Sequence, residues 1–270
     1  MANRPHSYRR VPNRRLSPGV SASRPLVVMP TYNEHDNIEE ILPQIMHYRP
    51  FHVLVVDDSS SDGTADAVRE AMRAYPGRIH LIEREGKLGL GTAYIAGFRW
   101  ALARDYTHIF EMDADFSHHP AALPRMLQAS RHADLVIGSR YVPGGRTVNW
   151  SPIRKLISRG GSLYARTILD LPVRDLTGGF KCFRRHVLDS IDLGSIESTG
   201  YAFQIELTYR AALSGHRIAE IPITFAERLH GASKMSSTIF FEAMYRVLQL
   251  RWEAGQHWVP RDDTVGVPAD

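Results

Sequence analysis

A chain of 270 residues, with 43% hydrophobic and 23% charged side chains, has the balance of a globular protein with one sizeable core. The single cysteine, Cys182, excludes an internal disulfide framework and a cysteine-rich zinc site, so we expect a reducing compartment. No segment reaches the ~18 consecutive apolar residues that span a bilayer, and the N-terminus lacks the apolar core of a secretion signal.

Much of the formal net charge of +4 is concentrated at the N-terminus. Residues 1–24 contain no carboxylate, and they contain Arg4, Arg9, Arg10, Arg14, Arg15 and Arg24. With its proline, serine and asparagine content, this segment is predicted to be a disordered basic arm. It is either a solvated tail or a segment with weak attraction to an anionic membrane surface.

From Pro25 onward, short apolar runs alternate with segments of helical periodicity. The pattern predicts strands at 25–30, 51–58, 79–83, 108–113 and 134–139, with helices at 33–48, 62–75, 91–103 and 120–130. This alternation predicts an α/β fold whose mostly parallel sheet has helices on both faces and binds ligands at the carboxyl ends of its strands.

After about residue 145 the alternation loosens. We expect a helix at 151–169, a turn, short strand and helix within 175–191, a helix at 201–215 and a strand at 217–228. These pieces are too few for a second core, so we assign residues 25–235 to one domain, followed by a C-terminal helix and polar tail at 236–270.

Polar clusters fall where four of the predicted strands end: "PTYNE", "DDSSSDGT", "DADFSHH" and "GSRYVPGGR". Because carboxyl ends of parallel strands meet at one edge of a sheet, the four loops are expected to form one site.

Asp113 and Asp115 are the strongest candidates for chemistry in these loops. Residues i and i+2 of a strand project to the same face, so the two carboxylates converge on one cation if the strand persists to its edge. Mg²⁺ or Mn²⁺ fits such oxygen ligands. The alternative is a pair of turn and capping residues.

His118 and His119 do not predict a zinc site, since adjacent histidines rarely reach one ion and no third ligand has useful spacing. We expect them in a turn before Pro120. Asp62 is expected to cap a helix, whereas Asp57, at the tip of its strand, is better placed for a ligand's base or ribose. Lys87 precedes a glycine-containing helix start, where a phosphate is plausible.

Basic residues in the second half suggest a second anionic partner. Arg140 ends a predicted strand, Arg154 and Ser158 share one helical face, and Arg228 and Lys234 bracket the turn "ERLHGASK". Each is a surface charge or part of a diphosphate and phosphate site.

Eight motifs in order closely resemble the polyprenol-phosphate (dolichol-phosphate) mannose synthases, within the inverting nucleotide-sugar glycosyltransferases of family 2. They are "PTYNE", "VVDDSSSDGT", "KLGLGTAY", "MDADFSHHP", "GSRYVPGG", "DLTGGFKCFRR", "GYAFQIEL" and "ERLHGASKM". The resemblance runs from about Pro25 to Met235. It implies a GT-A (Rossmann-like) fold that takes GDP-mannose and a divalent ion, and makes a polyprenyl β-D-mannosyl phosphate for later glycosylation.

The resemblance also implies roles for individual residues. The guanosine would be held by Pro30, Tyr32, Glu34, Val55 and Asp57. The metal and diphosphate would be held by Asp113, Ala114 and Asp115, with Arg228 and Lys234 closing over the phosphates. The lipid phosphate would be received by Arg140, Arg154 and Ser158.

In this scheme the lipid phosphate is already an anion and needs no catalytic base, so the work is alignment and charge neutralisation, with Asp115, Arg140 and Arg228 as the catalytic residues. Ser117 stands where some relatives carry a glutamine metal ligand, so that ligand is a serine or water here. The chain also lacks the membrane helices that some relatives append.

The segment 237–259 has Phe240, Met244, Val247 and Leu248 on one stripe, with Glu242, Arg246 and Gln249 largely opposite, and ends near Trp252 and Trp258. It is either a helix at the membrane interface, or on a membrane partner, or an ordinary helix packed on the core. We therefore expect a peripheral protein on the cytoplasmic face of the membrane, with or without a separate anchor protein.

Three other functions stay open. A polyprenyl-phosphate glucosyltransferase would use UDP-glucose with much the same phosphate groups. A nucleic-acid-binding module is disfavoured because the basic charge lies in the arm and the acidic rim would repel a phosphate backbone. A metal-dependent phosphohydrolase would need a second cluster of ligands and a base.

Overall fold

The structure is a computed structural model that describes residues 23–198, 200–227 and 237–255. Nearly all of the predicted basic arm, together with Arg228, Lys234 and Trp258, lies outside this part of the chain. The division into arm, catalytic domain and tail therefore stays a prediction.

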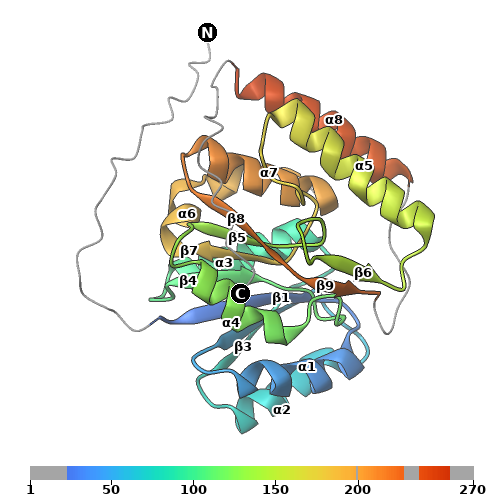
Figure 1. The fold of residues 1–270 in the computed structure, drawn as a ribbon. Helices are drawn as coiled ribbons and strands as arrows, with labels where there is room; N and C mark the ends of the chain where they lie inside the picture. Colours follow the sequence, from blue (N-terminus) through green and yellow to red (C-terminus); the bar gives the residue numbers. More distant parts are fainter. Residues whose placement is uncertain (1–22, 199, 228–236, 256–270) are drawn as a thin grey trace.

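The predicted alternation of strands and helices in the first half is confirmed (Figure 1). It consists of β1 (Pro25–Thr31), α1 (His35–His47), β2 (His52–Asp57), α2 (Thr64–Ala74), β3 (Ile79–Glu83), α3 (Leu90–Leu102), β4 (His108–Glu111), the 3₁₀ helix η1 (Pro120–Ala122), α4 (Leu123–Ala129) and β5 (Leu135–Ser139).

The second half has shorter strands and longer helices. It consists of β6 (Arg146–Val148), α5 (Pro152–Leu169), β7 (Lys181–Arg184), α6 (Arg185–Ser190), the 3₁₀ helix η2 (Leu193–Ser195), α7 (Gly200–Leu213), β8 (Ile218–Pro222), β9 (Thr224–Ala226) and α8 (Ser237–Glu253).

Seven strands form the main sheet in the order β3-β2-β1-β4-β7-β5-β8. All neighbours are parallel except β7, which runs antiparallel to both β4 and β5. The mostly parallel sheet is thus confirmed. The strand order reverses between β1 and β4, which places a crevice at their carboxyl ends.

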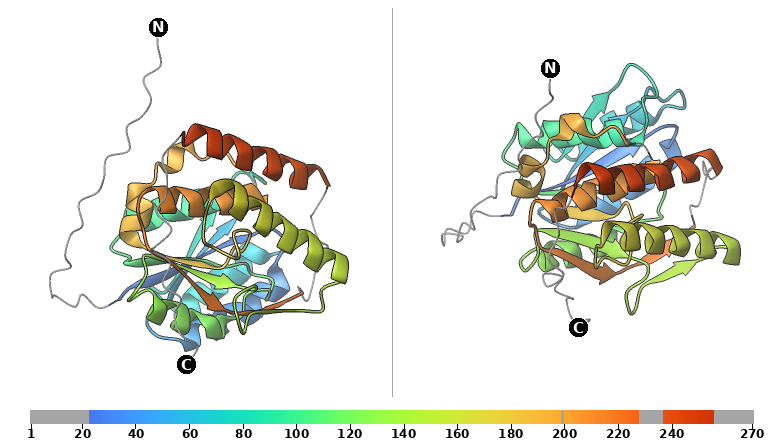
Figure 2. Two further views of the ribbon diagram at one scale, coloured as in Figure 1. Left: turned by 45° about the horizontal axis from the view of Figure 1, so that its top comes forward. Right: turned by 90° about the horizontal axis from the view of Figure 1, so that it is seen from above.

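Helices cover both faces of this sheet, as predicted, because successive strand residues point to opposite faces. Val27, Met29 and Val55 pack with α1, α2 and α4 on one face. Leu26 and Val28 pack with α3, α6 and α7 on the other. On that second face, α5 and α8 lie side by side as an outer pair beyond α7 (Figures 1 and 2).

The single strand predicted at 217–228 is wrong, because the chain changes partner at Ile223. β8 pairs with β5 in the main sheet, whereas β9 pairs with β6 in a separate two-stranded sheet. The Ile223 backbone N–H donates to the Ser139 carbonyl, and its own carbonyl accepts from Arg146 N–H. The apolar run is continuous, so only these long-range pairings divide it.

The predicted stripe of α8 is also wrong, although the helix is present. Val247 and Leu250 are buried against the core, while Leu248 is exposed, so Val247 and Leu248 do not share a face. Arg246, expected on the outer side, points inward and pairs with the fully buried Glu206. The ion pair with Glu206 of α7 holds Arg246 on the inner side of α8. Periodicity alone does not indicate such a partner.

Candidate active site

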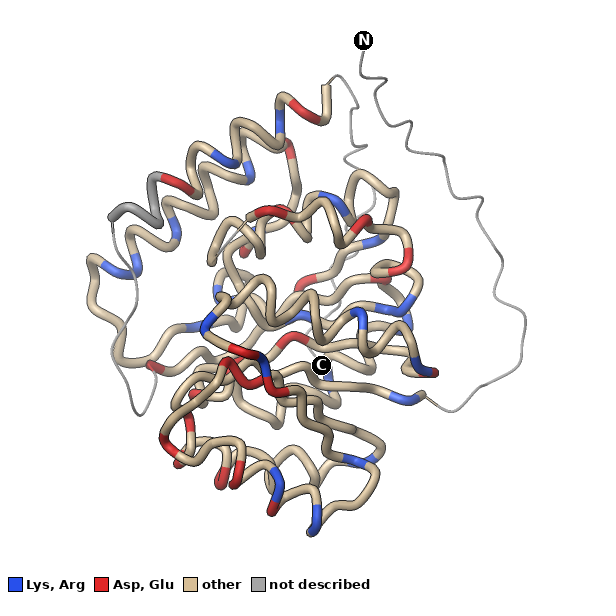
Figure 3. The backbone as a smooth tube through the Cα atoms, turned by 180° about the vertical axis from the view of Figure 1, so that it is seen from behind, with Lys and Arg blue, Asp and Glu red and all other residues tan. Residues whose placement is uncertain are grey.

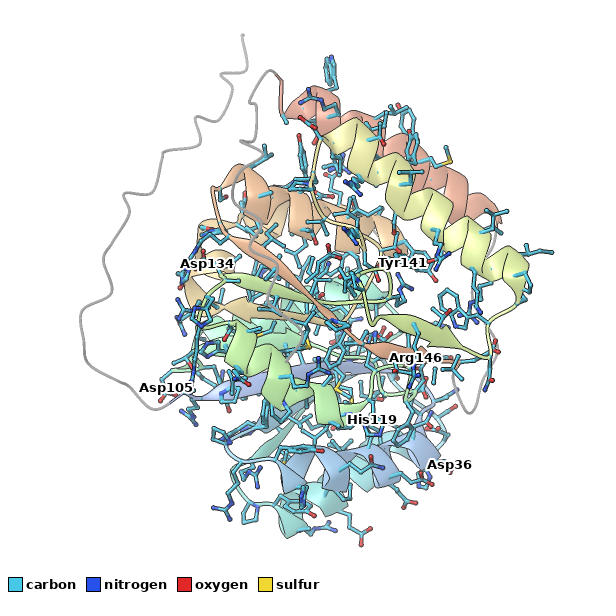
Figure 4. The ribbon with its side chains drawn as sticks, in the orientation of Figure 1. Asp36, Asp105, His119, Asp134, Tyr141 and Arg146 are labelled. Atoms are coloured by element: carbon cyan, nitrogen blue, oxygen red, sulfur yellow. The ribbon has the colours of Figure 1, made fainter. Side chains whose placement is uncertain are left out.

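A cleft of about 440 Å³ opens at the carboxyl ends of β1, β4 and β5. It is lined by residues from both halves of the chain, among them Pro30, Tyr32, Glu34, Asp58, Lys87, Asp113, Ala114, Asp115, Ser117, Arg140, Trp150, Arg154, Thr177, Tyr201, Gln204 and Phe225. The prediction that loops after several strands form one site is therefore confirmed. Figure 4 shows Tyr141 and Arg146 on this side of the molecule, with Asp105 and Asp134 on the other.

The loop after β1 supplies one wall of the cleft. The Lys87 ammonium lies over the Tyr32 ring, 3.9 Å from its centroid. This cation–π contact joins the loop after β1 to the segment before α3. The backbone N–H of Glu34 donates to Thr64 Oγ1 at 2.9 Å, and its carboxylate accepts from Asn37 Nδ2 at 2.6 Å. The two residues border the cleft on a fixed backbone.

Val55 and Asp57, expected at the guanosine, do not line the cleft. Val55 lies in the hydrophobic core with no exposed surface. The Asp57 carboxylate accepts from Thr31 Oγ1 at 2.8 Å and from Ser60 N–H at 2.9 Å, so it ties the loops after β1 and β2 together. The next residue, Asp58, reaches the cleft, where it pairs with Arg84. The strand tip carries two consecutive aspartates, and the sequence pattern alone does not show which of them reaches the cleft.

Asp113 and Asp115 both line the cleft, but not by strand alternation. β4 ends at Glu111, two residues before the predicted end at Asp113. Both residues instead line the cleft from the segment after β4, where Phe116 has a φ of 61° and Ser117 N–H donates to Asp115 Oδ1 at 3.0 Å. Tyr94 O–H donates to Asp113 Oδ1 at 3.3 Å, so α3 holds the first carboxylate.

The two histidines beyond this turn have local roles. His118 is buried, and its Nδ1 accepts from Asp113 N–H at 3.1 Å, while its ring stacks on Phe180. Burial lowers the pKa of His118, against the raising effect of Asp113 and Asp115. His119 Nδ1 accepts from Ala121 N–H, which caps η1 and confirms the expected turn before Pro120.

A buried polar pair lies directly behind the acidic turn. Glu111 in β4 is the cross-strand neighbour of Lys181 in β7, and neither has exposed surface. Burial raises the pKa of Glu111 to about 7 and lowers that of Lys181 to about 8. Lys181 Nζ donates to the Gln204 carbonyl and to its Oε1, at 2.7 and 2.6 Å, which fixes a side chain that borders the cleft.

Arg140, at the end of β5, is buried yet borders the cleft. Its guanidinium donates to both carboxylate oxygens of Asp175 and to Thr177 Oγ1. Burial alone would lower the pKa of Arg140, but the charge and hydrogen bonds of Asp175 raise it. The predicted residue is therefore in place, with a partner that the sequence had not indicated.

Arg154 and Ser158 line a narrow apolar pocket of about 50 Å³ between α5, α7 and α8, which confirms that they share one face. Arg154 lies 4.2 Å from the Trp150 ring centroid and pairs with Glu227 at 2.9 Å. Ser158 Oγ accepts from Tyr141 O–H at 2.6 Å. Because Arg154 also lines the main cleft, the apolar pocket and the cleft are neighbours.

Several residues of the cleft were missed from the sequence: Trp150, Thr177, Tyr201, Gln204 and Phe225. "DLTGGF" and "GYAFQIEL" contain three of them, so those motifs were signals, but no polar chemistry drew attention to Trp150 or Phe225. These two rings contact each other and surround the Arg140 guanidinium. They lower the local polarity around that charge.

The sequence comparisons with known proteins all indicate the same family. The sequence model of glycosyl transferase family 2 matches residues 26–192. A polyprenol monophosphomannose synthase of Mycolicibacterium smegmatis is 48% identical over 84% of this chain and 86% of its own length. An undecaprenyl-phosphate mannosyltransferase of Micrococcus luteus is 50% identical over 87% of this chain and 96% of its own.

Solved structures share the fold. Glucosyl-3-phosphoglycerate synthase from Mycobacterium tuberculosis, with Mn²⁺, uridine diphosphate and its product, superposes with a TM-score of 0.62 at 19% identity, covering 86% of this chain and 81% of that one. A mannosyltransferase from Pyrobaculum calidifontis with GDP-Man and Mn²⁺ gives 0.54 at 19%, covering 84% and 69%. At these identities the likeness extends to the fold alone, which is the GT-A type that the sequence predicted.

Proposed function

The chain belongs to glycosyl transferase family 2 and is a polyprenyl-phosphate mannosyltransferase of that family, and we propose that it takes mannose from GDP-mannose and transfers it with inversion. The product would be a polyprenyl β-D-mannosyl phosphate. The observation that carries this proposal is near-50% identity to two polyprenyl-phosphate mannosyltransferases along more than four fifths of the chain.

A divalent cation, Mg²⁺ or Mn²⁺, fits the acidic side of the cleft. Asp113 and Asp115 both border it, and carboxylate oxygens are preferred ligands of these ions. Ser117, also at the cleft, would supply a third oxygen. When bound, the ion would neutralise charge on the departing diphosphate. The two structural neighbours named above were solved with Mn²⁺.

On the donor side, we assign Pro30, Tyr32 and Glu34 to the guanosine and Ala114 to the diphosphate, since all four border the cleft. Val55 and Asp57 would act from behind this wall. Asp57 orders the loops of Thr31 and Ser60. Arg228 and Lys234, beyond the described residues, stay in the proposal as cations that close over the donor phosphates.

On the acceptor side, we assign Arg140, Arg154 and Ser158 to the lipid phosphate. Ser158 accepts a hydrogen bond from Tyr141, which leaves its own hydroxyl proton available for a phosphate oxygen. The phosphate is ionised near neutral pH, so it attacks the anomeric carbon directly. The chain's own work is to align the two substrates in line and to stabilise the charge that moves to GDP, with Asp115, Arg140 and Arg228 in the catalytic roles.

The outer helix pair suggests how the protein meets a lipid. The exposed face of α5 carries Ile153, Leu156 and Leu163, and that of α8 carries Tyr245, Leu248 and Trp252, with Trp252 85% exposed. α5 also has four basic residues and no acidic one, and the positive charges along it are visible in Figure 3. We propose that this face lies on an anionic membrane surface, with the apolar pocket next to Arg154 opening toward it.

This contact differs from a membrane span. Among the described helices, none combines the length and apolar character needed to cross a bilayer. A peripheral position on the cytoplasmic face, with or without a separate anchor protein, is part of the proposal.

The decisive experiment is transfer of radiolabelled mannose from GDP-mannose to a short polyprenyl phosphate, with and without Mg²⁺, and with UDP-glucose as a parallel donor. A metal-dependent, mild-acid-labile mannolipid is the expected product. A glucolipid from UDP-glucose would retain the mechanism and correct the donor. Release of mannose 1-phosphate and GMP without any lipid product would favour a phosphohydrolase, and no reaction with either donor would refute the proposal.

A further inference from the structure

The guanidinium of Arg140 is held in one orientation by three separate contacts. Nε donates to Asp175 Oδ2 at 2.8 Å, and Nη2 donates to Asp175 Oδ1 at 2.5 Å and to Thr177 Oγ1 at 2.8 Å. The Arg140 backbone N–H also donates to Asp175 Oδ2, at 2.9 Å. A planar fork fixed along one edge by a carboxylate has little rotational freedom left.

Asp175 is itself fixed from the opposite side. It has no exposed surface, and its backbone N–H donates to Glu220 Oε1 at 2.9 Å, while Arg174 N–H donates to Glu220 Oε2 at 2.8 Å. Glu220 lies in β8, directly beside Ile137 of β5. The sheet that ends in Arg140 therefore also holds the carboxylate that orients it.

One edge of the guanidinium is left over. Nε and Nη2 are occupied, and Nη1 has no hydrogen-bond partner among the residues that the structure describes. Arg140 borders the cleft, whereas Asp175 does not. Nη1 is therefore the guanidinium nitrogen that is left for a ligand in the cleft.

We infer that Asp175 is a positioning residue for the acceptor phosphate, because it fixes Arg140 so that Nη1 presents its two N–H groups to a phosphate oxygen. This inference rests on the proposed function and adds a residue to its acceptor side. Asp175 touches neither substrate, so it acts through Arg140 alone. Since the buried pair has no net charge, it contributes directed hydrogen bonds, and Arg154 contributes the more accessible positive charge.

The partners of Arg140 and Arg154 support this division. Asp175 is wholly buried, so its ion pair persists when a ligand enters. Glu227, the partner of Arg154, has a side chain that is 46% exposed, so a phosphate can take its place. One arginine is therefore fixed in advance, and the other is free to exchange its partner.

The test is Asp175→Asn, which keeps the shape of the side chain and removes its charge. We expect kcat/KM for a short polyprenyl phosphate to fall on the order of 10²-fold, as displacement of an aligned group does, while the KM for GDP-mannose and the Kd of GDP stay unchanged. Binding of farnesyl phosphate in the presence of GDP, measured by calorimetry, should weaken in parallel. Unchanged or tighter acceptor binding would overturn the inference.

Two further variants keep this test interpretable. Asp134→Asn removes a similarly paired aspartate at the other end of β5 and should leave both KM values unchanged. Thr177→Val removes the hydroxyl that accepts from Arg140, so it should also weaken acceptor binding. This variant tests the inference if Asp175→Asn fails to fold. If the wild-type enzyme makes no mannolipid, the proposed function is refuted. If the wild type makes mannolipid, and Asp175→Asn and Thr177→Val bind the acceptor as tightly as it does, only the role of Asp175 is refuted.

Discussion

The two ends of the main sheet use similar polar residues in different ways. At the amino end, Asp134 accepts from the backbone N–H and Nε of Arg217, and Tyr106 lies within hydrogen-bond distance of His52 and His80. At the carboxyl end, Asp113, Asp115 and Arg140 all border one cleft of about 440 Å³.

The difference teaches that residue type and burial do not separate structural charges from functional ones. Asp134 and Asp115 are both partly or fully buried acids beside a strand of the same sheet. Only the second shares a concave space with side chains of opposite charge from distant parts of the chain. We therefore expect changes at the amino end to affect the free energy of unfolding, and changes at the carboxyl end to affect turnover.

Asp115→Ala should produce the largest effect. Loss of this carboxylate would remove an oxygen ligand that we propose for the cation, and with it part of the electrostatic stabilisation of the departing diphosphate, so we expect mannose transfer to fall by at least about 10²- to 10³-fold. Thermal unfolding should be nearly unchanged. Normal activity would refute the metal assignment, and chelation of divalent cations should reproduce the loss in the wild type.

Leu156→Glu should weaken the contact with lipid. This exposed residue of α5 would bring a negative charge to the face that we place on an anionic membrane. We expect sedimentation with vesicles of anionic phospholipid to fall about tenfold, since both apolar burial and attraction are lost. The matched control is Gln128→Glu, which adds the same charge at an exposed position of α4, on the opposite face of the sheet. An equal loss of vesicle binding in this control would refute the assignment.

Asp134→Asn should separate stability from activity. The substitution weakens charge-assisted hydrogen bonds to Arg217 and the contact with His186, and we expect the free energy of unfolding to fall by about 1–2 kcal/mol. Denaturant unfolding measures this loss. Transfer per folded molecule should stay at the wild-type rate, and a drop in kcat would break the distinction between the two ends.

His108 should give a smaller, pH-dependent effect. Burial lowers its pKa from 6.5 to about 4, so between these values the unfolded chain binds a proton that the folded protein excludes. Stability therefore falls as the pH drops from about 6.5 to about 4. In His108→Gln, the loss of unfolding free energy between pH 7 and pH 5 should be about 2 kcal/mol smaller than in the wild type. Parallel pH curves would contradict this explanation.

The sequence predicted most of the first half correctly, because each strand and helix there has its own local period. The rim loops, the capping role of Asp62 and the shared face of Arg154 and Ser158 followed from the same short-range rules. Asp62 accepts from the N–H of Thr64, the first residue of α2, although the N-cap position itself is Gly63. The family resemblance, not the spacing, supplied the individual roles in the cleft.

The features that were missed depend on contacts between distant residues. Nothing near Arg140 in the sequence marks Asp175 as its partner, 35 positions away. The division of 217–228 depends on β5 and β6, and the inward turn of Arg246 depends on Glu206 in another helix. Periodicity reports which face of an element is apolar, but it does not report which buried acid or strand will meet it.

The reversed direction of β7 has a consequence for how such an enzyme changes its acceptor. Because β7 runs antiparallel to β4 and β5, the segment that leads into β7 arrives at the cleft, where Thr177 and Gly179 line it, while Asp175 lies buried behind Arg140. Residues 170–180 are therefore a continuous segment next to the proposed acceptor site. We expect substitutions in this segment to change the acceptor more than the nucleotide sugar. The same fold and donor site can in this way be combined with different phosphate-bearing acceptors.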